Sequence, residues 1–127
     1  MTELVVSGPP IPWQRAKRQG TRYFTHPDVD AAKTAIAWEI LAKRIRPTDA
    51  RVAVTLEFHL PPDTGRSKKA ALADIDNCTK LVLDACNGKA FNDDRQVDEL
   101  HVTMHRNSTT PRTVIRIDEL PPTHSIE

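Results

Sequence analysis

The sequence predicts a single α+β domain, in which a mixed or antiparallel sheet of about four main strands carries two helices on one face. Three observations predict this fold. The 127 residues are enough for one domain with a sizeable core, and too few for two. Alternating apolar residues indicate strands, and two segments have apolar residues at the 3.6-residue spacing of a helix. Residues 1–127 are therefore taken as one domain, in which 120–127 are expected to form a frayed tail.

The first half of the chain predicts a strand, a loop and a helix. Residues 2–7 are rich in β-branched side chains and predict a strand, whereas the prolines that follow exclude helix. Residues 22–25 fit either a second strand or a loop. A helix is expected from an N-cap at Asp28 to about Arg46, because Pro47 stops it. Its expected apolar face comprises Ala32, Ile36, Trp38, Ile40, Leu41 and Ile45, with Trp38 in the core or in a dimer interface.

The second half contains the clearest strand and the second helix. Residues 51–60 alternate apolar and polar side chains, so one face of this strand meets the core and the other meets solvent or a partner. A helix is expected from about Asp74 or Asp76 to Cys86, and Gly88 suits the left-handed conformation that follows a helix end. Two closing strands are expected at residues 96–106 and 112–119.

The composition excludes several classes of protein. No apolar run is long enough to cross a bilayer, and the N-terminal residues lack the basic start and apolar stretch of a secretory signal. A cytoplasmic protein without a membrane partner is therefore expected. Cys78 and Cys86 lie eight residues apart in the second helix, about 12 Å along its axis, which is too far for a disulfide. Both are expected to be buried thiols.

The net charge of +1 hides an uneven distribution of charge. Residues 14–22 carry four bases and no acid, whereas residues 74–99 hold seven acids against three bases. Basic segments beside an acidic cluster suit a nuclease, in which bases hold phosphates and acids hold metal ions. The alternative is that these segments are ordinary solvated surface. The residues expected to bind DNA are Arg15, Lys17, Arg18, Arg22, Lys68 and Lys69.

The acidic stretch itself has the residue types of a magnesium site. Asp74 and Asp76 stand at the start of the helix, and Asp93 and Asp94 follow it. If the turn at 88–95 folds back beside the start of the helix, the four carboxylates converge. Crowded carboxylates either share a proton or bind a divalent cation. We expect Mg²⁺, for which Mn²⁺ can substitute, and Lys80 could add a positive charge on a bound phosphate.

Other interpretations of the polar residues have less support in the sequence. A calcium-binding EF-hand loop fails on spacing, because Cys78 and Thr79 occupy positions that need a ligand and a glycine. Sugar hydrolysis by paired carboxylates is disfavoured because the chain has few aromatic side chains that could stack on sugar rings. The five histidines are scattered along the sequence and are more typical of surface groups than of metal ligands, although His59, His101 and His105 could share a solvent-side row.

The stretch resembles the signature of the RusA family of Holliday-junction resolvases. The pattern is Asp-x-Asp-Asn-x-x-Lys from Asp74 to Lys80, then Asp84, Asn87-Gly88 and Asp-Asp-x-Gln-Val from Asp93. This resemblance implies a Mg²⁺-dependent endodeoxyribonuclease that acts as a homodimer and cuts four-way junctions symmetrically. Many members occur in phages and prophages. The implied site residues are the metal ligands Asp74, Asp76 and Asp94, their frequent neighbour Asp93, and the essential Lys80.

Two alternatives stay open. One is a protein of the same fold that binds junctions or another nucleic acid without cutting, although such a binder gains nothing from acids beside phosphates. The other is a small metal-binding protein without a DNA partner, against which the basic segments argue.

Overall fold

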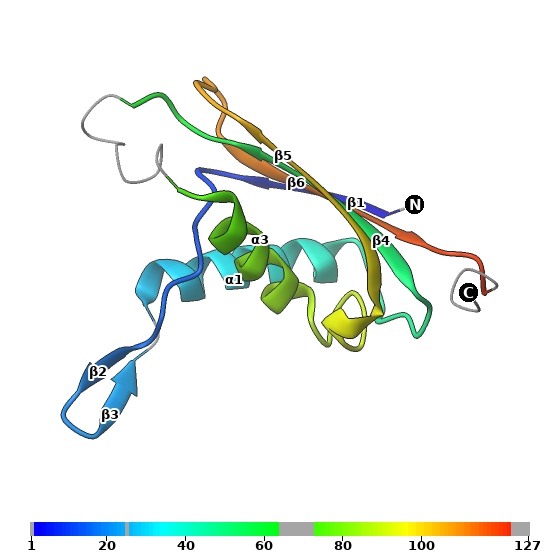
Figure 1. Cartoon of the computed structure of the whole chain (residues 1–127), viewed down its shortest axis with the longest axis horizontal. Coiled ribbons are helices and arrows are strands. Elements are labelled where there is room, and N and C mark those ends of the chain that lie inside the picture. Colours follow the sequence, from blue (N-terminus) through cyan, green and yellow to red (C-terminus); the bar gives the residue numbers. More distant parts are fainter. Residues whose placement is uncertain (1, 25, 64–72, 123–127) are drawn as a thin grey trace.

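The computed structural model describes residues 2–24, 26–63 and 73–122. One helical layer lies against one face of a four-stranded sheet, and a small hairpin projects from this body (Figure 1). The predicted single α+β domain is confirmed. The elements in chain order are strands β1 (Thr2–Ser7), β2 (Lys17–Gln19) and β3 (Arg22–Phe24), helix α1 (Pro27–Ala42), strand β4 (Val52–His59), helix α3 (Ile75–Cys86), the 3₁₀ turn η1 (Asp94–Gln96), and strands β5 (Val97–His105) and β6 (Arg112–Glu119).

The sheet is mixed, with strand order β1-β6-β4-β5. β6 runs antiparallel to both β1 and β4, whereas β4 and β5 are parallel and are connected through α3. The alternation predicted for β4 is confirmed: Val52, Val54, Leu56 and Phe58 are buried, and the side chains between them are partly exposed. The buried row faces the helices, and no described helix covers the other face of the sheet (Figure 1).

The core lies between this sheet and the two helices. Leu4, Leu56, Phe58 and Ile115 come from three strands of the sheet and are essentially inaccessible to solvent. Phe91, in the loop after α3, is also fully buried and forms bridges with Thr48 and Asn87. Burial of this much apolar surface, at about 25 cal/mol per Å², is the main force that holds α1 and α3 against the sheet.

Helix α1 differs from its prediction at both ends. His26, not Asp28, caps its start, because the His26 imidazole accepts a hydrogen bond from the Asp28 backbone N–H at 3.2 Å. The helix ends at Ala42, before the expected Arg46, since Arg44 takes a left-handed conformation (φ 55°). The Ile45 N–H then bonds to the Ile40 carbonyl and the Arg44 N–H to the Leu41 carbonyl, which is the Schellman termination of a helix.

The expected apolar face of α1 is only partly buried. Ile36 and Ile40 are in the core, but Trp38 and Leu41 are 65% and 66% exposed. Trp38 is therefore not a core residue. Trp38 and Leu41 lie three residues apart on the outer surface of the helix, where they form an apolar patch that no described residue of this chain covers.

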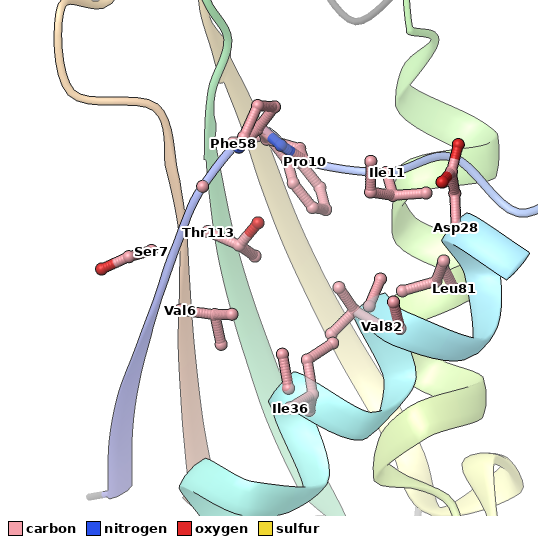
Figure 2. Close-up of a pocket in the computed structure, with 15 residues that line it drawn as sticks. Val6, Ser7, Pro10, Ile11, Asp28, Ile36, Phe58, Leu81, Val82 and Thr113 are labelled. Carbon is pink, nitrogen blue, oxygen red and sulfur yellow. The ribbon is translucent and has the colours of Figure 1, made fainter.

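The proline-rich segment after β1 crosses the two helices near their N-terminal ends and lines an apolar cavity of about 280 Å³ (Figure 2). Pro10 and Ile11 form one wall, Ile36 of α1 and Val82 of α3 form others, and Asp28 is the one acidic side chain in the lining. A cavity of this composition offers no set of groups for hydrolysis. None of the described helices is long and apolar enough to span a bilayer.

Candidate active site

Helix α3 positions the first pair of predicted metal ligands. Asp74 is its N-cap, and its carboxylate accepts hydrogen bonds from the Asn77 backbone N–H at 2.9 Å and from the Asn77 side-chain amide at 3.3 Å. This cap satisfies one of the free N–H groups at the helix start. Asp76 lies in the first turn, and both carboxylates are exposed. The local sequence therefore fixes Asp74 while leaving Asp76 free to bind a cation.

Lys80 lies one turn beyond Asp76, on the exposed side of α3. Its ammonium group is 3.8 Å from the centre of the Trp13 ring, which is a cation–π contact. Trp13 is held in place by its backbone N–H, which donates to the Asn77 carbonyl at 2.8 Å, and by partial burial against the core. The sequence does not reveal this contact, because Trp13 and Lys80 are far apart along the chain. Trp13 thus positions the charge of Lys80.

The second pair, Asp93 and Asp94, is placed by η1. Asp93 caps this turn in a capping box with Gln96, whose side-chain amide donates to the Thr48 and Ala50 carbonyls at 2.7 and 2.9 Å. The Arg95 guanidinium, 3.1 Å from the carboxylate, lowers the pKa of Asp93 to about 2. The pair is therefore anchored firmly, although the sequence predicts only a turn here.

Asp94 has the opposite electrostatic environment. Its pKa is raised, first by its hydrogen bond with Asp93, then by desolvation, and then by the negative charges of Asp93 and Asp84. A raised carboxyl pKa means that negative charge is crowded at this position. A bound cation would relieve this repulsion, so the oxygen ligands present here fit a divalent metal ion.

The four predicted carboxylates do not converge within one chain. Asp94 lies near Asp84 at the end of α3, about 15 Å along the helix axis from the N-cap Asp74. Figure 1 shows η1 beyond the C-terminal end of α3, so the turn at 88–95 does not fold back beside the helix start. In the part of the chain that the structure describes, no three of these carboxylates have oxygens within 4.8 Å of one another.

The basic residues of the first segment lie on the β2–β3 hairpin and the chain leading into it. Gly20 (φ 64°) allows a two-residue turn that pairs Gln19 with Arg22. Arg15, Arg18 and Arg22 are exposed, and the hairpin projects from the body of the molecule (Figure 1). Lys17 lies on the same hairpin, in β2. Lys68 and Lys69 lie outside the described residues.

The cysteines agree with the sequence prediction. Cys78 and Cys86 are free and buried in α3, and burial raises the pKa of each thiol to about 12. Both act as small apolar groups that fix the inner face of the helix, which leaves its outer face to Asp76, Lys80 and Asp84.

Comparison with known proteins identifies one family. A protein-family model described as Endodeoxyribonuclease RusA matches residues 7–118, which include the hairpin, α3 and both aspartate pairs. A search of curated proteins found no match.

Proposed function

The chain belongs to the RusA endodeoxyribonuclease family, and we propose that it is a Mg²⁺-dependent nuclease that resolves four-way DNA junctions by symmetric phosphodiester cleavage as a homodimer. The observation that carries this proposal is the family match over residues 7–118, which spans every residue of the acidic motif. We place its action in the cytoplasm, where branched DNA arises during recombination and repair, and an origin in a phage or prophage stays a prediction.

Five residues of the motif receive roles in this proposal. Asp74, Asp76 and Asp94 hold Mg²⁺ or Mn²⁺, and Asp93 supports Asp94. The bound ion supplies Lewis acidity and a more acidic water molecule at the scissile phosphate. Lys80 stabilises the negative charge that grows on the phosphate oxygens, and its cation–π contact keeps the ammonium group in place before DNA binds.

A homodimer would bring the two separated groups of carboxylates together. Asp74 and Asp76 stand at one end of α3 and Asp94 at the other, so one chain presents two half-sites. Suppose that α3 packs antiparallel to α3 of the partner subunit about a twofold axis. The N-terminal end of α3 in each chain then lies beside the partner's Asp94. Two equivalent sites then form, as symmetric cleavage requires.

The apolar patch on α1 suits the same contact. Trp38 and Leu41 are exposed on the helical layer, on the same side of the sheet as α3. Exposed aromatic and aliphatic side chains at helical spacing are typical of interfaces. We therefore assign the dimer contact to the helical layer, with Trp38 and Leu41 as its apolar part and the polar face of α3 beside it.

The exposed arginines of the hairpin would bind the DNA arms. The hairpin leaves the body only a few residues after Trp13, so a strand bound to Arg15, Arg18 and Arg22 passes close to Lys80. Such contacts with phosphates supply affinity without base specificity.

The test is cleavage of a synthetic four-way junction with Mg²⁺ and with EDTA, using a linear duplex of the same sequence as control. We expect paired nicks in opposite strands of the junction only when Mg²⁺ is present. Binding of the junction without any cleavage would favour the non-catalytic alternative, and neither binding nor cleavage would refute both readings.

A mixed dimer tests whether the site is shared. Asp74→Asn and Asp94→Asn, each inactive alone, are refolded together. If ligands come from both chains, a mixed dimer contains one intact site and recovers cleavage of one strand. No recovery from any mixture, with mixed dimers shown by native mass spectrometry, would place all ligands in one chain.

A further inference from the structure

We infer that Glu57, His59 and His105 form a second metal site, of the Zn²⁺ class, on the helix-free face of the sheet. The site is independent of the proposed nuclease site. Its three ligand atoms lie within 4.8 Å of one another, whereas the carboxylates around α3 form no such group in the described part of the chain.

The sheet itself assembles this cluster. β4 and β5 are parallel, and His59 is paired in register with His105. Glu57 lies two residues before His59, so its side chain points to the same face. The Leu60 N–H bonds to the His105 carbonyl at 2.8 Å, which fixes the two strands at this point. Three potential ligands thus come from the rigid ends of two neighbouring strands.

The distances suit a small transition-metal ion. One Glu57 oxygen, Oε1, lies 3.5 Å from Nε2 of His59 and 3.5 Å from Nε2 of His105. Ligands bonded at about 2.0 Å in a tetrahedron are separated by about 3.3 Å. An ion could therefore bind between these atoms after small movements of the side chains.

Glu57 is oriented for this role by its other oxygen. Oε2 binds Nη1 of Arg116 at 2.5 Å, and Arg116 also binds Glu3 through Nε at 2.6 Å. The hydrogen bond from Arg116 lowers the pKa of Glu57, which keeps the carboxylate ionised. Oε1 is left facing the two imidazoles. Hydrogen-bonded support of this kind is usual for carboxylates that bind metals.

His59 contains an unsatisfied buried atom. Its Nε2 is buried and has no hydrogen-bond partner, since its 3.5 Å separation from Glu57 is too long for a good bond. Desolvation first, and then the nearby charges of Arg112 and His105, lower the pKa of His59. The neutral imidazole that results is the form that binds metals, and a cation would satisfy the orphaned nitrogen.

The ligand chemistry selects the ion. Two imidazole nitrogens and one carboxylate oxygen suit Zn²⁺ and similar ions, whereas Mg²⁺ prefers oxygen ligands only. The imidazole rings are stacked 4.4 Å apart with an angle of 9° between their planes, so they must tilt toward a shared ion. His105 has the freedom to do so, because its side chain is 45% exposed.

The test uses Co²⁺ and Zn²⁺ as probes on the full chain. We expect one equivalent of Co²⁺ to give an absorption spectrum with nitrogen ligation, and Zn²⁺ to displace it. Glu57→Gln and His105→Ala should each weaken Zn²⁺ binding by at least about 10-fold in calorimetry, since loss of a group that merely supports a ligand already costs that much. Their folding is checked by circular dichroism without metal, and both positions are partly exposed, so His59, the most buried ligand, need not be altered.

His101→Ala is the matched control. His101 lies on the same face of β5 and is 3.6 Å from Glu99, but among the described residues it belongs to no group of three potential ligands. It should bind Zn²⁺ as the unaltered chain does. The double variant Asp74→Asn, Asp94→Asn should also keep full Zn²⁺ affinity, which separates this site from the nuclease site. Equal weakening by His101→Ala and His105→Ala, or Zn²⁺ binding that disappears in the double aspartate variant, would overturn the inference.

Discussion

The carboxylates around α3 and the Glu57–His59–His105 cluster lie on opposite sides of the same sheet and contrast in how they are assembled. The α3 residues form a strong sequence pattern, yet in one chain they stand at the two ends of a helix. The cluster residues form no motif along the sequence, yet their potential ligand atoms lie within 4.8 Å of one another. Motif strength and preassembly are therefore separate properties of a site.

The contrast has a physical origin. Residues on one helix are separated by its rise of about 1.5 Å per residue, so a motif that spans a helix cannot bring its ends together. Residues on paired strands lie about 5 Å apart whatever their separation in sequence. A site built along a helix needs a second body to complete it, whereas a site built across a sheet does not.

The largest expected effect comes from removing a carboxylate. Asp74→Asn or Asp94→Asn should lower junction cleavage at least about 100-fold, because a metal ligand is lost. Junction binding should be unchanged or tighter, since repulsion between carboxylate and phosphate is also removed. Asp30→Asn, an exposed acid in the first turn of α1, is the control and should cleave normally. Normal cleavage by Asp74→Asn or Asp94→Asn would contradict the proposed nuclease site, and its contrast with the Glu57–His59–His105 cluster would no longer hold.

Lys80 should give the next largest effect. Lys80→Ala is expected to lower the cleavage rate about 10- to 100-fold with little loss of binding, because its charge acts mainly in the transition state. Trp13→Phe should lower the rate less, since a weaker cation–π contact leaves the ammonium group in place. Single-turnover cleavage and gel-shift assays give the two quantities, with Lys89→Ala as control. A loss confined to binding would make Lys80 an ordinary phosphate contact.

Variants of the hairpin test how far its positive charges bind DNA, separately from the two proposed metal sites. Replacing Arg15, Lys17 and Arg18 by alanine should weaken junction binding and flatten its salt dependence by up to about 2.7 in the slope of log affinity against log salt concentration. Zn²⁺ binding at the cluster should not change. An unchanged slope over a salt series would mean that DNA lies elsewhere, and residues 66–69 would be the next candidates.

The smallest effect is the pH dependence caused by Asp94. Its raised pKa means that the folded chain holds this proton more tightly than the unfolded chain, so ionised Asp94 destabilises the metal-free fold. Asp94→Asn should therefore raise the melting temperature near neutral pH. The difference should vanish toward pH 3, below the ordinary carboxyl pKa of about 3.9, where both states are protonated. Thermal unfolding in EDTA measures it, and equal curves at all pH values would show that Asp94 is not crowded.

Local patterns predicted much of this fold. The alternation of β4 and the acidic cap, apolar face and glycine of α3 gave correct elements, because each depends on neighbours in sequence. Helix α1 was predicted too long, since the left-handed Arg44 that ends it is not a residue type that favours this conformation. Trp38 was misplaced because helical spacing alone does not say which apolar stripe meets the sheet.

The sites were predictable only in part. The motif supplies the aspartates and Lys80 as candidates, but the contact of Lys80 with Trp13 depends on where the proline-rich segment lies. The sequence favours surface histidines and allows His59, His101 and His105 to share a solvent-side row, but it does not reveal that the His59 and His105 rings stack. Their proximity follows from the parallel register of β4 and β5, which no local pattern fixes.

The position of β6 affects how the protein is made. Among the described strands it is the last in sequence, yet it lies inside the sheet between β1 and β4. In the described part of the chain, β1 pairs with β6 alone, and Thr2 is paired with Ile117. During synthesis β1 therefore has no partner in the sheet until residues 112–117 have been made. Sheets that depend on such distant pairings fold slowly, and chains that expose apolar strands in the meantime are prone to aggregate.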